Sequence, residues 1–278
     1  MSNRWGYSSV HQRLAALAIA CLLIAGCTGT AAHEVPPSTA PSINISVEPE
    51  PIQLCGSAIR LEVPGTSNIF GAGVAQPPAP AGGGGGSHPP CLSIPRGTST
   101  IDFDATGRIY FEALRFDNPS QFHRCAQGHE VTAPVSGPDG PSVGGCSTNP
   151  GGTSISAAGV ISGISSRRGV GYLVGVFLPD AVPEGPPPES LDFGDDYDFT
   201  ALCPEMRQTF FIGDGHTKDG TVQRFGVPRG ATRLYLGFTD AWGFRHDPGY
   251  YDDNSGSLQV KTRLRSMPGG ARSPCRAS

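Results

Sequence analysis

The chain has 278 residues, of which 39 are glycine and 27 are proline, and its formal net charge is −4 at neutral pH. That content of glycine and proline is too high for a mainly helical protein, and long amphipathic helical windows are absent. We therefore expect short strands joined by irregular loops. No cluster of basic residues is present, which argues against a nucleic-acid partner.

The first 26 residues are predicted to be an export signal. Arg4 and Arg13 supply positive charge ahead of the apolar segment Leu14–Gly26, which is too short for a comfortable membrane span. The segment runs into Cys27 as Leu-Ile-Ala-Gly-Cys, which matches a bacterial lipoprotein signal whose cysteine carries acyl chains such as palmitate. An ordinary secretory peptide with an incidental Cys27 is the alternative. Because Thr28 replaces the Asp that retains lipoproteins in the inner membrane, we expect an outer-membrane anchor, facing the periplasm or the outside.

Three segments are expected after the signal. Residues 27–55 are rich in Pro, Ser and Thr and are predicted to be an extended tether. Residues 56–265 are predicted to form one β-domain, and residues 266–278 a short tail. The signal holds two of the 20 basic residues and no acid, so 18 basic and 24 acidic residues remain and the mature charge is about −6.

Six cysteines follow the lipidation site. An even number in an exported chain predicts up to three disulfides, whose connectivity is not deducible from sequence. Cys125 and Cys146 flank a Gly/Pro/Ser-rich segment and are a candidate local pair, and Cys275 is a candidate for tying the tail to the domain. A zinc site at His123, Cys125 and His129 is an alternative, but no second Cys/His pair stands at ligand spacing. The six are Cys55, Cys91, Cys125, Cys146, Cys203 and Cys275.

Alternating and β-branched segments predict the strands of this domain. Gly171–Leu178 is almost continuously apolar, as expected of a strand that is buried on both faces. Thr232–Phe238 and Ser257–Leu264 alternate, so each is expected to have one packed and one wet face. Further strands are expected at Ile59–Val63, Ser99–Asp104, Arg108–Phe111, Thr209–Ile212 and Thr221–Val227, with a turn at residues 105–107.

Two Pro/Gly-rich segments, residues 75–87 and 133–152, are expected to be surface loops. The first contains the run Gly82–Gly86. This run does not fit a phosphate-binding loop, because no Lys-Ser or Lys-Thr pair follows it and no helix begins there.

The loop from Asp240 to Ser257 is far longer than a hairpin needs and is rich in Asp, Asn and aromatic residues. Asp240 ends one predicted strand, and Asp253 and Asn254 begin the return to the next. If these strands are antiparallel neighbours, the three side chains meet at one rim, where their oxygens suit Ca²⁺. The alternative is an ordinary turn, in which Asp, Asn, Gly and Pro serve the backbone alone.

This region resembles the PA-IL-like family of calcium-dependent, galactose-binding bacterial lectins. The family pattern is an apolar strand ending in Asp, here Leu234–Asp240, and then Pro-Gly-x-Tyr-x-Asn-Asn-Ser-Gly-Ser, here Pro248–Ser257, before the final strand. The likeness extends over about residues 58–264 and is strong only over residues 234–260. It implies an all-β, jelly-roll β-sandwich of galactose-binding-domain-like type, here with long Gly/Pro-rich loops. Weaker likenesses lie at Leu61–Gly73, Ile101–Gly107 and Gly171–Leu178.

The resemblance also implies a binding site. The side chains of Asp240, Asp253 and Asn254 would hold Ca²⁺, together with the backbone carbonyls of Tyr250 and of a residue near Tyr110. The ion would coordinate two adjacent sugar hydroxyls, and Asp240 and Asp253 would accept hydrogen bonds from them.

The chain departs from the family pattern within the same loop. Seven residues, Ala241–Asp247, stand where the family has one, and Tyr250 replaces a smaller residue. Asp253 replaces an Asn, which adds negative charge and is expected to strengthen cation binding. The family's His and Gln sugar contacts have no counterpart in residues 151–163, so calcium is better supported than galactose.

Two residues of the inserted segment are ligand candidates. Trp242, the only tryptophan after the signal, is expected either to stack on a sugar ring or to anchor the loop against the sandwich. His246 is a candidate hydrogen-bond donor to a sugar.

We therefore expect a lipid-anchored, calcium-dependent carbohydrate-binding protein without catalytic activity, with a galactose-type ligand. A calcium-stabilised structural or protein-interaction domain is the alternative. A glycoside hydrolase is a third possibility, for which two carboxylates are needed. Consecutive acids in a Gly-bearing loop are, however, typical of a solvated face, and no serine-hydrolase or zinc-peptidase motif is present. The acids concerned are Glu189, Asp192, Asp195, Asp196 and Asp198.

Overall fold

The structure is a computed structural model. It describes residues 55–57, 59–111, 135–141, 152–167, 169–181 and 184–266, which belong to one compact unit, Pro49–Ser278. These residues form strands and short 3₁₀ turns without an α-helix, which confirms the all-β fold class. Within the same ranges, no helix is long and apolar enough to cross a membrane. The predicted signal, Cys27, the tether up to residue 54 and residues 267–278 lie outside them.

The larger sheet contains the two longest strands side by side. β3 (Thr98–Tyr110) and β15 (Ser255–Ser266) run antiparallel, with Tyr110 opposite Ser255. β1 (Arg60–Pro64) pairs with the other edge of β15, and β12 (Arg224–Gly226) pairs with β3. The sheet is completed by β10 (Ala201–Leu202) beside β12, and by β4 (Val135–Gly137) and β5 (Gly140–Pro141) at the end of β3.

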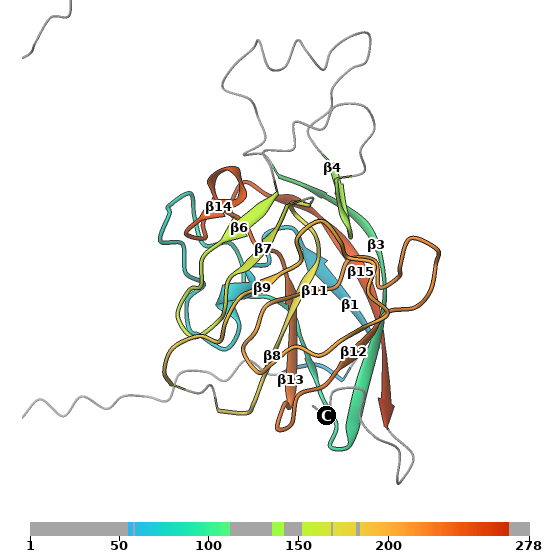
Figure 1. Ribbon diagram of the computed structural model, residues 1–278. Coiled ribbons are helices and arrows are strands. Elements are labelled where there is room, and N and C mark those ends of the chain that lie inside the picture. Colours follow the sequence, from blue (N-terminus) through green and yellow to red (C-terminus); the bar gives the residue numbers. More distant parts are fainter. Residues whose placement is uncertain are drawn as a thin grey trace, which may run out of the picture. The chain divides into compact units, whose positions relative to one another are not determined.

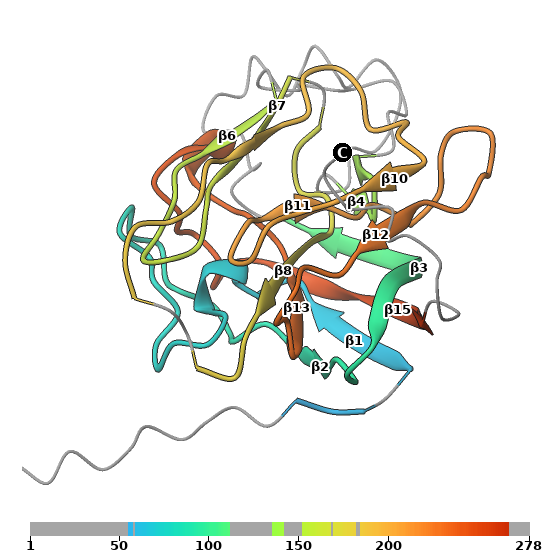
Figure 2. The same ribbon diagram turned by 60° about the horizontal axis from the view of Figure 1, so that its bottom comes forward.

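A second sheet, in the order β11-β8-β13-β2, packs against the first (Figures 1 and 2). Its central strands, β8 (Val174–Leu178) and β13 (Arg233–Gly237), are antiparallel, and every residue of both is buried. The prediction that Gly171–Leu178 contains a strand buried on both faces is confirmed. The edge strands are β11 (Phe210–Phe211) and β2 (Cys91–Ser93).

A third, smaller sheet covers the opposite face of β8 and β13. It contains β14 (Arg245–His246), β6 (Thr153–Ile155), β7 (Ile164–Ser166) and β9 (Leu191–Asp192), and β14 lies beside β6 in Figure 1. Two 3₁₀ turns, η1 (Ile69–Gly71) and η3 (Trp242–Phe244), lie in the connecting loops.

Two clusters of buried side chains lie on either side of the middle sheet. Leu234 of β13 packs in one cluster with Phe103 of the larger sheet, and its neighbour Tyr235 packs in the other with Ile155 and Ile164 of the third sheet. Alternate residues of β13 therefore enter different cores, which explains why this strand has no solvent-exposed face.

The prediction of one wet face is consequently wrong for β13 and correct for β15. Arg233 is buried, and its guanidinium donates to the carbonyls of Pro179 and Asp180 and to the hydroxyl of Tyr235. These acceptors allow a predicted surface arginine to lie inside the protein. On β15, Leu258, Val260 and Thr262 are buried, whereas the alternate residues Gln259, Lys261 and Arg263 are exposed.

The predicted turn at residues 105–107 is also wrong. β3 continues through it as one 13-residue strand, because β15 pairs with it along its whole length and places Leu258 opposite Gly107. Gly107 has a φ of 126°, and a Cβ there would lie 2.5 Å from the carbonyl oxygen of Ser257. A glycine that suggested a turn thus permits a close approach within the sheet.

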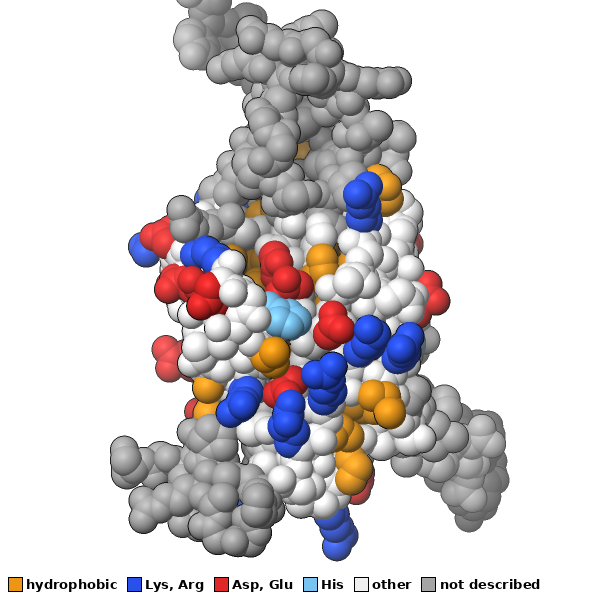
Figure 3. Space-filling view, turned by 90° about the vertical axis from the view of Figure 1, so that its right-hand side faces the viewer, with side chains coloured by type: hydrophobic (Ala, Val, Ile, Leu, Met, Phe, Trp, Pro, Cys, Tyr) orange, Lys and Arg blue, Asp and Glu red, His pale blue; other side chains and the backbone are white. Residues whose placement is uncertain are grey.

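On the side of the molecule where β3 and β15 lie, basic and acidic side chains are interspersed with scattered hydrophobic ones (Figure 3). Lys261 lies 3.4 Å from the carboxylate of Asp104, and Arg265 donates to Asp102 at 2.6 Å. The mixture of signs gives this face no uniform charge.

One disulfide joins Cys55 to Cys91 of β2 and closes a separation of 36 residues. Cys55, which was assigned to the tether, is therefore covalently attached to the sandwich. Cys203 is disulfide-bonded as well. The candidate pair Cys125 and Cys146, the zinc alternative that shares Cys125, and Cys275 lie outside the described residues.

Candidate metal and ligand site

The loop between β13 and β15 connects two different sheets, yet its ends meet. Asp240 follows β13 by three residues, and Asn254 directly precedes β15. The Nδ2 atom of Asn254 donates to Asp240 Oδ2 at 2.8 Å and to the Gly65 carbonyl at 3.3 Å. The antiparallel pairing that we considered for these two strands is wrong, because β13 and β15 face each other across the core. The side chains still reach one rim, where β13 ends and β15 begins.

Asp240 has a buried carboxyl group with few polar contacts. Its Oδ1 atom accepts the Ala241 N–H at 2.8 Å, and its Oδ2 atom accepts from Asn254. Burial raises the pKa of Asp240 well above its ordinary value; the two hydrogen bonds lower it, and the charge of Asp253 raises it again. A buried carboxyl beside a second carboxylate favours a nearby positive charge.

The other predicted ligands lie next to this pair. Asp253 is half-buried and close enough to influence the charge of Asp240. The Oδ1 atom of Asn254 is buried and, within the described part of the chain, has no hydrogen-bond partner. Tyr110, at the end of β3, is opposite Ser255 in the sheet, so its backbone lies beside the residue after Asn254. Tyr250 follows Gly249, whose N–H donates to the Asp240 carbonyl at 3.1 Å.

The glycine run Gly82–Gly86 packs against this loop through backbone hydrogen bonds. The Tyr250 N–H donates to the Gly82 carbonyl at 2.9 Å, and the Gly86 N–H donates to Asp252 Oδ1 at 2.8 Å. A Cβ on Gly83 would lie 2.3 Å from the ring of Tyr250. The run was predicted to be only a surface loop. Its backbone lies so close to Tyr250 that a side chain would not fit at Gly83, which explains the glycine there.

Two buried polar residues that were not among the predicted site residues hold the two neighbouring loops in place, Tyr251 the loop between β13 and β15 and Asn68 the loop of residues 75–87. The Tyr251 hydroxyl accepts the Asp240 N–H at 3.0 Å and donates to the Phe238 carbonyl at 3.2 Å. The Asn68 amide donates to the carbonyls of Pro78 and Gly85 at 2.8 and 3.0 Å. Both residues lie within segments that resemble the lectin family, and that resemblance was the available signal.

The inserted segment is anchored by Phe244 and not by Trp242. The Phe244 side chain is 1% exposed and packs with its ring centroid 5.4 Å from that of Phe111. Trp242 is 58% exposed, and its ring centroid lies 5.5 Å from that of Tyr250. Phe244 therefore has the anchoring role that was considered for Trp242. The indole of Trp242 faces solvent.

His246 lies on β14 and is exposed. Its backbone carbonyl accepts the Ser156 N–H at 2.7 Å and thereby joins the inserted segment to β6. These backbone contacts attach the loop to the third sheet. They do not involve the imidazole, so hydrogen bonding of His246 to a sugar stays a prediction.

The acids considered for glycoside hydrolysis are all exposed, and four of the five cap turns or lie near basic side chains. Asp192 accepts the Gly194 N–H at 2.9 Å, and this hydrogen bond lowers its pKa. Asp195 lies 2.8 Å from the guanidinium of Arg167. A general acid needs the opposite environment, in which the pKa of the carboxyl is raised.

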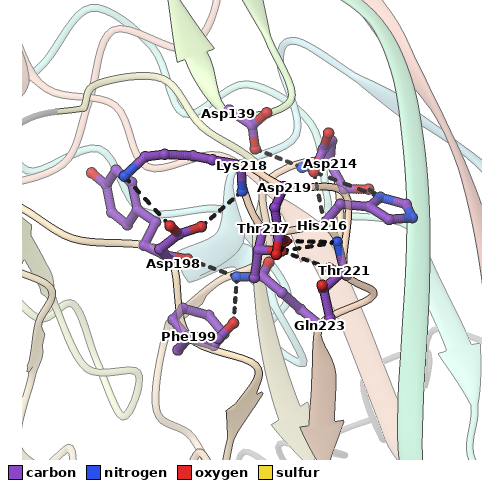
Figure 4. Close-up of polar contacts among 11 residues, drawn as sticks. Asp139, Asp198, Phe199, Asp214, His216, Thr217, Lys218, Asp219, Thr221 and Gln223 are labelled. Atoms are coloured by element: carbon purple, nitrogen blue, oxygen red, sulfur yellow. Dashed lines mark hydrogen bonds and ion pairs between the residues drawn. The ribbon is translucent and has the colours of Figure 1, made fainter.

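Two further acids of that segment, Asp196 and Asp198, lie near the ammonium group of Lys218 in the loop before β12, and Figure 4 shows the network around Asp198. Asp198 accepts the Lys218 backbone N–H at 2.7 Å and lies 3.7 Å from its ammonium group. In the same network, Asp139 accepts the Asp214 N–H at 2.8 Å. Asp139 and Asp198 thus join separate loops, whereas the carboxylates of Asp214 and Asp219 accept N–H groups within their own turns.

The side-chain donors predicted for a cation at the rim around Asp240 are all oxygen atoms. In the described ranges, no three His, Cys, Asp or Glu side chains cluster as a metal site. A cation at this rim would instead be held by two carboxylates, the Asn254 amide oxygen and backbone carbonyls. Such an oxygen-rich set suits Ca²⁺, and a positive charge would compensate both the buried Asp240 and the unpartnered Asn254 Oδ1.

No protein-family model matches this chain, and a search of curated proteins found no significantly similar sequence.

Proposed function

We propose that this protein is a lipid-anchored, calcium-dependent carbohydrate-binding protein without catalytic activity. The observation that carries the proposal is the contact between the buried side chains of Asp240 and Asn254, with Asp253 beside them. It brings together, from two sheets, the side chains that the resemblance to the lectin family selects.

The donor set supports calcium in preference to a transition metal. Asp240, Asp253 and Asn254 offer only oxygen atoms, and the backbone carbonyls of Tyr110 and Tyr250 would add two more. Hard oxygen ligands of this kind suit Ca²⁺, whereas zinc and copper sites in proteins usually contain His or Cys. Asp253, half-buried and nearer to solvent than Asp240, leaves a side from which a ligand hydroxyl could reach the ion.

A carbohydrate ligand is supported by the exposed Trp242, which has Tyr250 at its side. An aromatic side chain next to an oxygen-coordinated cation offers a sugar both an apolar surface and an electrophile for its hydroxyls. The galactose type of the ligand rests on the family resemblance alone.

Catalysis is disfavoured by the environment of the acidic segment. Asp192 has a lowered pKa, and Asp195 and Asp196 are exposed and lie near basic side chains. The lowered pKa of Asp192 is the opposite of the raised pKa that the general acid of a glycoside hydrolase requires.

The proposal is tested by calorimetric titration of the metal-free protein, first with CaCl₂ and then with methyl galactoside. Binding of the calcium-loaded protein to a glycan array is measured separately. We expect stoichiometric calcium binding and glycan binding that disappears in EDTA. Calcium binding without any glycan response would support the structural alternative. An absence of calcium binding would contradict both. Turnover of a chromogenic galactoside that Asp195→Asn or Asp196→Asn abolishes would establish an enzyme.

A further inference from the structure

Trp242 is a large apolar side chain that the protein leaves in solvent. It is 58% exposed, whereas the twelve largest fully buried side chains of the described residues include Phe244 of the same 3₁₀ turn. An exposed indole forgoes the free energy of burial, so an exposed and fixed tryptophan points to a binding role.

The backbone around Trp242 is held on both sides. Phe244 is anchored in the core, its N–H donates to the Ala241 carbonyl at 2.8 Å, and β14 pairs with β6. Phe244 and His246 have φ values of 58° and 69°, which L-residues rarely adopt. Such conformations persist where the surrounding contacts determine them. The loop therefore presents the indole in a defined place.

Tyr250 connects Trp242 to the calcium ligands. The two ring centroids are 5.5 Å apart with an interplanar angle of 51°, so the rings form a bent, two-part surface. The backbone of Tyr250 is fixed by its hydrogen bond to the Gly82 carbonyl and has a φ of 68°. Only two residues separate Tyr250 from Asp253. The N–H of Gly249, directly before Tyr250, donates to the Asp240 carbonyl at 3.1 Å, so the aromatic pair lies beside the proposed cation site.

We propose that Trp242 and Tyr250 form a subsite for a second sugar ring, so that the ligand is an oligosaccharide whose terminal ring lies on the calcium ion. This inference rests on the proposed function. The cation site selects a ring with two adjacent hydroxyls, and the aromatic pair selects a neighbouring ring with an exposed C–H face. Because residues 241–247 have no counterpart in the lectin family that the chain resembles, this subsite distinguishes the present chain from that family.

The experiment uses Trp242 as its own reporter. In the full chain carrying Trp5→Phe, Trp242 is the only tryptophan. Its fluorescence is followed in CaCl₂ while methyl galactoside, lactose, melibiose or phospholipid vesicles are added, and calcium affinity is measured separately by calorimetry. We expect a disaccharide or longer glycan to shift the emission to the blue and to bind at least tenfold more tightly than methyl galactoside.

Trp242→Ala is expected to abolish the tenfold preference while leaving calcium affinity unchanged, and Trp242→Phe is expected to restore part of it. The exposed Ile59→Ala is the matched control for loss of a surface apolar group, and it should have no effect. Equal affinities of the Trp242→Ala variant and the parent protein for the disaccharide would overturn the subsite alone. Calcium binding without glycan binding would overturn the proposed function and the subsite together. An emission shift with vesicles and none with saccharides would replace the subsite with a membrane contact.

Discussion

Asn254 Nδ2 lies 2.8 Å from Asp240 Oδ2, although the strands beside these two residues belong to different sheets. The contact closes a loop that crosses from the middle sheet to the larger sheet at one rim of the sandwich. It buries one carboxyl and one amide with few other partners, and it leaves the amide oxygen of Asn254 without a hydrogen bond among the described residues. The following predictions depend on this arrangement.

Asp253→Asn replaces the carboxylate with an amide of similar shape and removes one negative charge. We expect calcium affinity to fall about tenfold, which corresponds to about 1.4 kcal/mol, because the cation loses one charged partner but keeps an oxygen ligand. Asp247→Asn is the matched control, since it removes an exposed carboxylate from the same loop without removing a proposed ligand. Calorimetric titration with CaCl₂ measures both. Equal losses in the two variants would indicate a general charge effect and not coordination by Asp253.

Gly83→Ala is expected to displace Tyr250 and to weaken calcium binding. A Cβ at Gly83 would lie 2.3 Å from the Tyr250 ring and 2.9 Å from its Cα, whereas a Cβ at Gly82 would meet nothing within 4 Å. Both glycines have a positive φ, of 67° and 87°, so Gly82→Ala controls for backbone strain. Overpacking of this kind costs about 1–3 kcal/mol. Urea denaturation with and without calcium measures the free energy of unfolding of both variants. We expect Gly83→Ala to lower it more than Gly82→Ala does, and equal decreases would contradict the close approach of Gly83 to Tyr250.

Phe244→Ala and Trp242→Ala are expected to separate anchoring from ligand binding. Loss of the buried phenyl ring should lower the free energy of unfolding by about 3–5 kcal/mol. Loss of the exposed indole should change it by less than about 0.5 kcal/mol. Urea denaturation of the two variants checks this, and a strongly destabilised Trp242→Ala protein would mean that the indole packs against the sandwich.

Removal of the disulfide in the double variant Cys55→Ser, Cys91→Ser is expected to destabilise the domain. The bond closes a separation of 36 residues, for which the chain-entropy relation gives about 4 kcal/mol. Denaturation midpoints of the parent and the double variant, both in the absence of reductant, measure the difference. A midpoint unaffected by the substitutions would indicate that the pairing contributes nothing to the folded unit.

The sequence predicted the fold class. It also predicted the burial of strands whose hydrophobic pattern matches the exposure of their two faces. β15 alternates because one face is packed and the other is wet, and β8 is continuously apolar because both of its faces are buried. β13 also alternates, but Arg233 is satisfied by backbone carbonyls inside the protein, and residue polarity alone could not reveal those acceptors. Gly107 looked like a turn because sequence does not distinguish a glycine that bends the chain from one that admits a neighbouring strand.

The candidate site was predictable at its ends and not in its surroundings. Asp240, Asp253 and Asn254 carried the chemistry and the family resemblance, and the structure brings them together. Gly82 bonds to Tyr250, and Phe244 in place of Trp242 packs on Phe111. Both contacts join segments that are far apart in the sequence, so local sequence patterns could not predict them. The Cys55–Cys91 pair was likewise not deducible, since six cysteines allow fifteen connectivities.

The most direct test of the calcium site is a calorimetric titration of the metal-free protein and its Asp240→Asn variant with CaCl₂. We expect one ion to bind per parent chain and no measurable binding to the variant, because the substitution removes the buried charge that the cation would compensate. Circular dichroism establishes that both proteins are folded before the titration. A parent protein that binds no calcium, or a folded variant that binds it with unchanged affinity, would contradict the account.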